Sequence, residues 1–148
     1  MVRIECGITE EHLEEVYSHP SMQKLSHDHR KAEPIHHHLV SYYSAFNDDK
    51  FVGAYMVVYI SKMELEAHML LLPKAIKYSR ELTTLMAKIL FKKVDRISTV
   101  IIDGMNTAKN HVEKVGFMLE GIKRECFMVG GIKKDAYIYG LLKSEFKG

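Results

Sequence analysis

Three titratable side chains occur at alternate positions in the stretch that covers residues 63–72. Glu64, Glu66 and His68 follow one another at steps of two, so a β-strand would place all three on one face. A carboxylate or an imidazole at such a position can take a proton from a nucleophile, and we predict that Glu66 or His68 is a general base. An alternating polar face is also the ordinary solvent side of a strand, and this interpretation stays open.

Basic side chains follow directly, in the stretch PKAIKYSRELTTLM. Lys74, Lys77 and Arg80 lie where apolar residues begin to recur at the three- and four-residue steps of an amphipathic helix. Positive charge near a helix N-terminus favours phosphate groups, because the side chains and the helix dipole attract anions in the same direction. We therefore predict phosphate contacts for Lys77 and Arg80. A solvated basic first turn is the alternative.

Histidines are concentrated in the polar, irregular segment before residue 39. Imidazole nitrogens are common zinc ligands, but the spacing here matches no zinc motif, and both cysteines are distant in the sequence. We predict no metal site and expect this segment to contact an acceptor molecule or to be exposed. The histidines are His27, His29, His36, His37 and His38.

The composition is that of an ordinary globular protein. The 148 residues are 47% apolar and 27% charged, with a net charge of +2, which predicts one domain spanning residues 1–148. Charges of both signs are interleaved, so we expect no nucleic-acid partner. No apolar run is long enough to span a membrane, and the N-terminus lacks a basic-then-apolar leader, so we expect a cytoplasmic protein. Cys6 and Cys126 are predicted to be buried free thiols.

The elements that must position these side chains can be predicted from periodicity. Alternating or continuous apolar residues predict strands, and three- or four-residue spacing predicts helices. The resulting order is β-α-(α)-β-β-β-α-β-α-β-β, a mixed sheet with helices on its faces. The predicted strands cover residues 2–6, 39–46, 51–60, 63–72, 98–102, 117–128 and 135–142, and the predicted helices begin at Thr9 and cover residues 74–94 and 107–115.

The C-terminal third contains an ordered set of motifs, which are Asn106, Lys114-Val115-Gly116-Phe117, Glu120-Gly121, Arg124, Gly131, Asp135 and Tyr139-Gly140. This set resembles the GCN5-related N-acetyltransferase (GNAT) superfamily, and best its branch that acetylates protein N-termini and small acceptors. The resemblance implies an α/β (α+β) fold. Its mostly antiparallel central sheet would have about seven strands, flanked by helices and splayed between the fourth and fifth strands. Phe117 would then pack in the core, and Glu120 and Arg124 could pair on one face of a strand.

The resemblance also implies an activity, the transfer of acetyl from acetyl-CoA to an amine on a small molecule or a peptide. Acetyl-CoA would enter the splay beside the backbone of Leu70, Leu71 and Leu72. Asn106 would bind the cofactor arm, with a simple helix N-cap as the alternative. The second long helix has no tyrosine to return a proton to the CoA thiolate, which leaves His111 as the candidate acid.

One motif of the family is missing from this chain. No glycine occurs between Gly53 and Gly104, so the glycine loop that cradles the CoA pyrophosphate in the family is either rebuilt or lost. A second interpretation follows, in which the chain is a non-catalytic protein with the same fold that binds another protein. Short proteins of this kind resemble virion or head-assembly proteins of tailed bacteriophages. The sequence does not indicate an oligomeric state.

Overall fold

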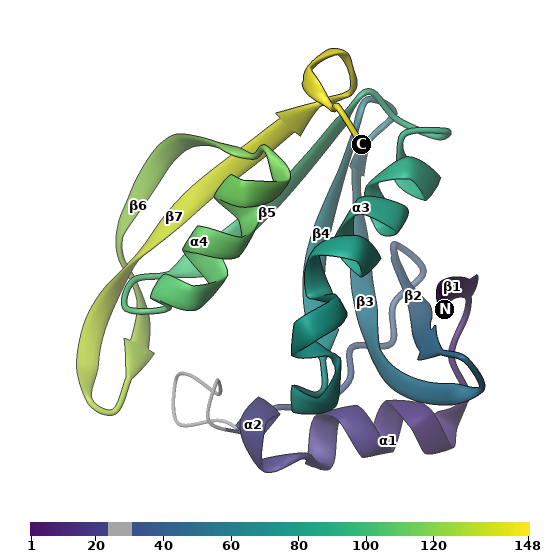
Figure 1. The fold of residues 1–148 in the computed structure, drawn as a ribbon. Helices are drawn as coiled ribbons and strands as arrows, with labels where there is room; N and C mark the ends of the chain where they lie inside the picture. Colours follow the sequence, from purple (N-terminus) through teal and green to yellow (C-terminus); the bar gives the residue numbers. More distant parts are fainter. Residues whose placement is uncertain (24–30) are drawn as a thin grey trace.

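The computed structural model describes residues 1–23 and 31–148, and these residues form a seven-stranded mixed sheet with helices on both faces (Figure 1). Neighbouring strands are antiparallel except for the parallel pair of β4 and β5, and the spatial order is β1-β2-β3-β4-β5-β7-β6. The predicted fold class is confirmed. The strands are β1 (Val2–Cys6), β2 (Val40–Asn47), β3 (Lys50–Ser61), β4 (Glu64–Leu71), β5 (Arg96–Ile102), β6 (Met118–Val129) and β7 (Ile132–Leu142).

The helices lie close to their predicted positions, with one exception. They are α1 (Glu10–Ser18), α2 (Pro20–Gln23), the 3-10 helix η1 (Pro73–Tyr78), α3 (Ser79–Leu90), α4 (Asn106–Val115) and the 3-10 turn η2 (Lys143–Glu145). As predicted, Thr9 caps α1, and its hydroxyl accepts a hydrogen bond of 3.1 Å from the His12 amide. None of the helices in the described ranges is both long and apolar enough to cross a membrane.

The exception is the long helix predicted for residues 74–94. Its first turns form η1 instead, because Tyr78 has φ −104° and ψ 1°, outside the α-helical region, and α3 begins only after it. Ile76, the first apolar residue of the predicted helical face, is therefore 65% exposed. A 3-10 turn keeps apolar residues near helical spacing, which is why the sequence pattern does not reveal the change.

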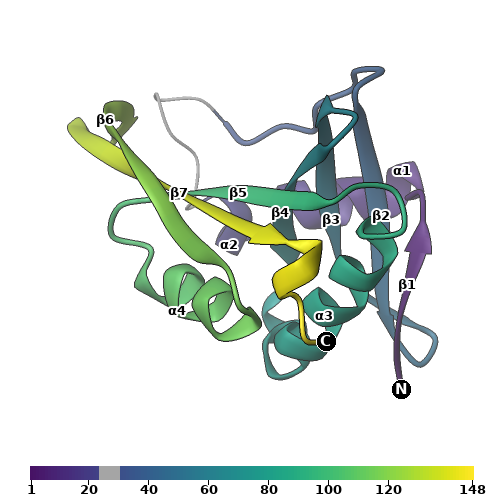
Figure 2. The ribbon, with the colours of Figure 1, turned by 90° about the horizontal axis from the view of Figure 1, so that it is seen from above.

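Two hydrophobic clusters pack against opposite faces of the sheet. Leu82, Met86 and Leu90 of α3 belong to the larger cluster, together with Tyr139 and Leu141 of β7. The smaller cluster joins α1 and α2 to the other face of β2, β3 and β4. Figure 2 shows the same division, with α3 and α4 on one side of the sheet and α1 and α2 on the other. Phe117, 8% exposed, lies in the larger cluster as predicted.

The sheet opens between β4 and β5, as predicted. Glu64–Glu66 pair with Arg96–Ser98, and within the described residues the register of the two strands continues no further. The strands meet at the top of Figure 1 and separate toward the bottom. β4 meanwhile stays paired with β3 as far as Leu71 opposite Gly53. We call the opening between residues 67–71 and 99–102 the gap.

Gly53 allows β4 to lie close to β3 at this point. Its φ is +145°, and a Cβ atom there would lie 2.6 Å from the Leu71 Cα and 2.9 Å from the Leu70 carbonyl oxygen. Real Cβ atoms do not approach backbone atoms so closely, so a side chain would push the two strands apart. The glycine therefore keeps the end of β4 against β3 and away from β5.

Both cysteines are free, as predicted, but the prediction that they are buried is wrong. Cys6 and Cys126 are exposed. Both lie on the two outermost strands of the sheet, β1 and β6. Both cysteines lie in strands, as expected, but an edge strand lacks the second neighbouring strand that would help to cover its side chains.

Candidate active site

The predicted bases lie on the face of β4 that also carries α1 and α2. Side chains alternate along β4, and Leu70 packs in the α1 cluster, which places Glu66 and His68 on the same face. Their side chains are about three-quarters buried, and the His68 Nε2 lies 3.4 Å from the Glu66 carboxylate. The hydrogen bond and the charge of His68, with a smaller effect of Lys123, lower the pKa of Glu66. Glu66 is therefore ionised at neutral pH.

Glu64 shares this face but is held by the neighbouring strand. The Ser98 hydroxyl donates to its carboxylate at 2.5 Å, and the Arg96 Nε donates to it at 3.1 Å. Both carboxylate oxygens of Glu64 are therefore engaged by side chains of β5. The network therefore separates Glu64 from the Glu66–His68 pair.

The same arginine binds a second carboxylate, that of Glu120 in β6. The Arg96 Nη1 donates to Glu120 at 2.6 Å, and Nη2 also donates to it. The predicted pair of Glu120 with Arg124 is therefore wrong. Irregularities between Leu119 and Gly121 and between Lys123 and Phe127 interrupt the alternation along β6, so a spacing of four does not give one shared face.

The position of Glu120 explains one glycine of the C-terminal motifs. A Cβ atom on Gly140 of β7 would lie 2.5 Å from the Glu120 carboxylate. The Glu120 side chain therefore crosses β7 over Gly140 to reach Arg96 in β5. The Glu120-Gly121 and Tyr139-Gly140 motifs meet in this ion pair.

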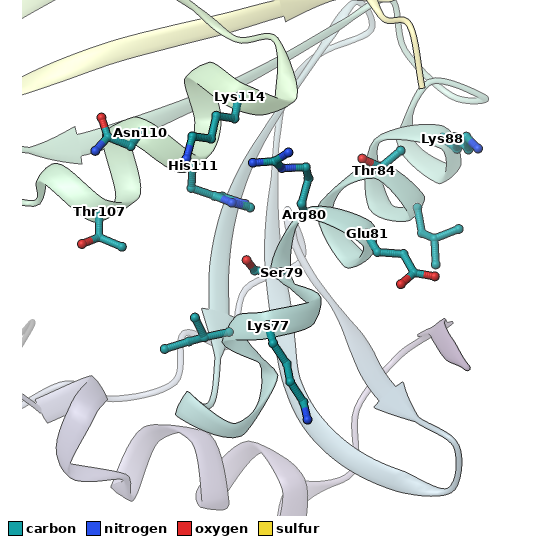
Figure 3. A pocket seen from close by; sticks show the side chains of 12 residues that line it. Lys77, Ser79, Arg80, Glu81, Thr84, Lys88, Thr107, Asn110, His111 and Lys114 are labelled. Carbon is teal, nitrogen blue, oxygen red and sulfur yellow. The ribbon is translucent and has the colours of Figure 1, made fainter.

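On the opposite face, α3 and α4 enclose an open groove of about 900 Å³ (Figure 3). Its lining is predominantly basic, because the described residues that line it include four cationic side chains and one acidic side chain, that of Glu81. Ile76 and Leu85 add apolar surface. The cationic residues are Lys77, Arg80, Lys88 and Lys114. Such a lining suits a ligand that is partly apolar and partly anionic.

His111 of α4 also lines the groove. Its Nε2 lies 3.0 Å from the Thr83 hydroxyl, and that hydroxyl lies 2.8 Å from the hydroxyl of the buried Tyr55. Burial lowers the pKa of His111, and the positive charges of Arg80 and Lys114 lower it further. The imidazole is therefore neutral at pH 7.

The three leucines predicted to contact the cofactor differ in orientation. The Leu72 amide donates to the Val52 carbonyl of β3 at 3.0 Å, so by alternation the backbone groups of Leu70 and Leu72 face β3. The backbone groups of Ala67, Met69 and Leu71 face the gap instead. Sequence reasoning missed Ala67 and Met69, although the period of two along a strand implies that they direct their backbone groups to the same side as Leu71.

Asn106 and Lys77 lie at the margins of this arrangement. Asn106 is the first residue of α4 and is exposed, while the N-cap position belongs to Met105, so the N-cap interpretation of Asn106 is wrong. Thr107 and Asn110 line the groove from the same helix. The Lys77 side chain extends away from α4, with its Nζ 5.1 Å from the Tyr78 ring centre (Figure 3).

The start of α3 offers little to an anion. Pro73 carries no amide hydrogen, and the amides of Ala75 and Ser79 donate to the carbonyls of Leu72 and Ile76. These two amides are therefore not available to an anion in the way that the amides of a glycine loop would be.

The histidine segment lies only partly within the described residues. His27 and His29 fall outside them, while His36, His37 and His38 are exposed, with the rings of the last two 4.3 Å apart. Across residues 1–23 and 31–148, no three His, Cys, Asp or Glu side chains are grouped as metal ligands would be.

Solved structures with the same fold are acetyltransferases. Spermidine N-acetyltransferase from Vibrio cholerae, solved in complex with CoA and spermine, has a TM-score of 0.83 and 14% identity, covering 99% of this chain and 98% of that one. A GCN5-related N-acetyltransferase from Brucella melitensis has a TM-score of 0.77 and 16% identity, covering 97% and 76%. A GNAT-family acetyltransferase from Bacillus anthracis has a TM-score of 0.63 and 23% identity, and the match covers 70% of this chain and 67% of that one.

These similarities establish the fold. No protein-family model matches the sequence, and no curated protein matches it. The chain therefore shares the GNAT fold at low sequence identity. The branch predicted from the C-terminal motifs and the bacteriophage origin stay predictions.

Proposed function

We propose that the protein is an N-acyltransferase that moves acetyl from acetyl-CoA to an amine. The observation that carries this proposal is the gap between β4 and β5, which begins where their three-residue pairing ends. A basic groove lies on one face of the sheet, and the Glu66–His68 pair lies on the other. If acetyl-CoA lies with its thioester in the gap, its phosphates lie on the face with the basic groove. The acceptor amine then reaches the thioester from the face with Glu66 and His68.

In the proposed reaction, the backbone groups of β4 that face the gap, those of Ala67, Met69 and Leu71, hold the acyl carrier. The Leu71 amide, which faces the gap, donates to the thioester carbonyl and stabilises the negative charge that develops there. The amine nitrogen attacks the carbonyl carbon, the new C–N bond forms, and the C–S bond breaks. Most of the catalysis in this scheme comes from positioning the two reactants.

Glu66 and His68 take up the proton that the amine loses. Glu66 is ionised and close to His68, so its carboxylate can orient the imidazole and stabilise the imidazolium that forms. The thiolate must gain a proton. We propose that water supplies it, because the lowered pKa of His111 leaves that residue little proton to donate at neutral pH.

The remaining predicted contacts belong to the acyl carrier. Arg80, exposed and directed into the groove, is proposed to bind its phosphates, and Lys77 is proposed to contact it as well. Asn106, at the start of α4, is proposed to bind the cofactor arm. The acceptor amine, from a small molecule or a peptide, approaches from the face of Glu66. The free, exposed Cys6 and Cys126 favour a reducing compartment such as the cytoplasm.

Calorimetric titration with acetyl-CoA tests the proposal directly. Binding is expected, together with acetylation of a mixed set of amines detected by mass spectrometry. The absence of binding would favour the alternative, a non-catalytic protein of this fold that binds a protein partner.

Variants at the predicted base separate binding from chemistry. Glu66→Gln and His68→Gln are expected to lower turnover by about 10²-fold or more while acetyl-CoA binds as before. Glu5→Gln, an equivalent change on exposed surface outside the site, is the control. Full turnover in both site variants would remove the pair from the mechanism.

A further inference from the structure

We propose that Arg80, His111 and Lys114 form a phosphoryl-binding site between α3 and α4, built from side chains in place of a glycine loop. This inference rests on the proposed function, because the ligand is taken to be the phosphate-bearing acyl carrier. It adds His111 and Lys114 to Arg80 as residues that contact the anion. The phosphate is then held by side chains and not by the backbone amides of a loop.

The three side chains converge from two helices. His111 and Lys114 are three residues apart on α4, so they are neighbours on one helical face. In Figure 3 the Arg80 guanidinium extends from α3 toward that face, and the His111 ring extends toward α3. All three residues line the groove.

The cations in this site have no carboxylate partner among the residues that the structure describes. Among residues 1–23 and 31–148, neither Arg80 nor Lys114 makes a salt bridge within 4 Å, whereas Arg96 of β5 binds two carboxylates. Both charges act on His111 and disfavour its protonation. Like charges held together without an acidic partner are destabilising, and a phosphoryl dianion would relieve this repulsion.

His111 can contribute a hydrogen bond as well. Its Nε2 is engaged by Thr83, and its Nδ1 has no partner among the described residues. Thr83 in turn contacts Tyr55, which is 2% exposed, so the imidazole is anchored to the core. Lys114 and Arg80 supply charge, and His111 supplies a positioned ring nitrogen.

The usual alternative for binding phosphate in this region is weak. The amide of Ser79, the first residue of α3, already donates to the Ile76 carbonyl. The anion is therefore expected beside α3 and facing α4, and not at the N-terminus of α3.

The test compares ligands that differ in phosphate. Acetyl-CoA, acetyl-pantetheine, adenosine bisphosphate and pyrophosphate are titrated against the whole chain and the variants Arg80→Gln, Lys114→Gln and His111→Gln. Lys109→Gln is the matched control, because Lys109 also lies on α4 but its Nζ packs 4.0 Å from the Tyr137 ring centre, outside the groove. Thermal melts without ligand verify that each variant is folded.

Arg80→Gln and Lys114→Gln are each expected to weaken acetyl-CoA binding by about tenfold or more and to leave acetyl-pantetheine binding unchanged. Acetyl-CoA binding of wild-type strength in both variants would overturn the site and leave the acyltransferase proposal standing. If no acyl compound binds, the acyltransferase proposal fails. Pyrophosphate and adenosine bisphosphate then test the phosphoryl-binding site independently of that proposal. The site is supported if these compounds stabilise the wild type and not the two variants. It is overturned if they do not stabilise the wild type.

Discussion

The two parts of the sheet on either side of the gap are covered to very different extents. The part from β1 to β4 has α3 on one face and α1 and α2 on the other, and it contributes to both hydrophobic clusters. Among the described residues, the part formed by β5, β7 and β6 is covered by α4 alone, and none of the ten residues of this helix is buried. β6, at the outer edge, is mostly exposed.

This difference indicates that the two parts of the sheet contribute differently to the stability of the fold and to the geometry of the gap. The first part contains the whole smaller cluster and shares the larger cluster with the second part. The second part is joined to it by the three-residue pairing of β4 with β5, by the Glu64–Arg96–Glu120 network, and by the larger cluster. Few interactions therefore set the width of the gap, and they can be tested one at a time.

The largest expected effect on stability is in the larger cluster. Leu82→Ala removes a fully buried side chain of α3 and is expected to lower the free energy of unfolding by about 2–5 kcal/mol. Val112→Ala on α4 removes a half-buried side chain and is expected to cost about 1 kcal/mol. Urea unfolding measures both. Equal losses would show that the two parts are packed equally tightly.

The next effect concerns the connection across the sheet. Arg96→Met leaves the carboxylates of Glu64 and Glu120 without their shared cation, and we expect a loss of about 1–3 kcal/mol in urea unfolding. Arg124→Met is the matched control. Arg124 is exposed in β6, so its replacement is expected to change stability by no more than about 0.5 kcal/mol. Indistinguishable variants would remove the network from the connection.

A smaller effect is expected at Gly140. Gly140→Ala would place a methyl group against the Glu120 carboxylate, which can swing away but then loses Arg96. A cost of about 1 kcal/mol follows. In a Glu120→Ala background the same glycine change should cost clearly less, which a double-mutant cycle measures. Additive effects would show that the glycine is needed for another reason.

The smallest effect is a dependence on pH. Arg96 holds the pKa of Glu120 below its ordinary value, so the folded state binds this proton less readily than the unfolded state does. The stabilisation is present above the unfolded pKa, near 4.5, and is lost as pH falls through the lower folded pKa. Glu120→Gln should flatten stability measured across this acidic range. An unchanged slope would contradict the assignment.

Most of the fold could be predicted from the sequence, because strand and helix periods are local signals. Strand order and the splay came from the resemblance carried by the C-terminal motifs. Exposure was less predictable. The strand-like segments that contain Cys6 and Cys126 predict burial, but the local pattern does not say which strands form the sheet edges. Ile76 was misplaced because a 3-10 turn resembles the start of a helix.

The candidate site was predictable only where its residues share one element. Glu66 and His68 lie on one strand, and their common face followed from the period of two. The partner of Glu120 is 24 residues away, and a strand irregularity hides the face on which they meet. Lys114 belongs to one of the C-terminal motifs, but its proposed contact with phosphate depends on α3 lying opposite α4, which the sequence pattern does not show.

The gap also has a consequence for dynamics. Among the described residues, the amides of Ala67, Met69 and Leu71 face the gap, where β4 has no pairing with β5, inside an otherwise hydrogen-bonded sheet. They should exchange their hydrogens with solvent far faster than the amides of β3 beside them. An extended ligand with alternating hydrogen-bond donors and acceptors would pair with these amides as a short additional strand does. Its binding should slow this exchange and make the two parts of the sheet unfold cooperatively.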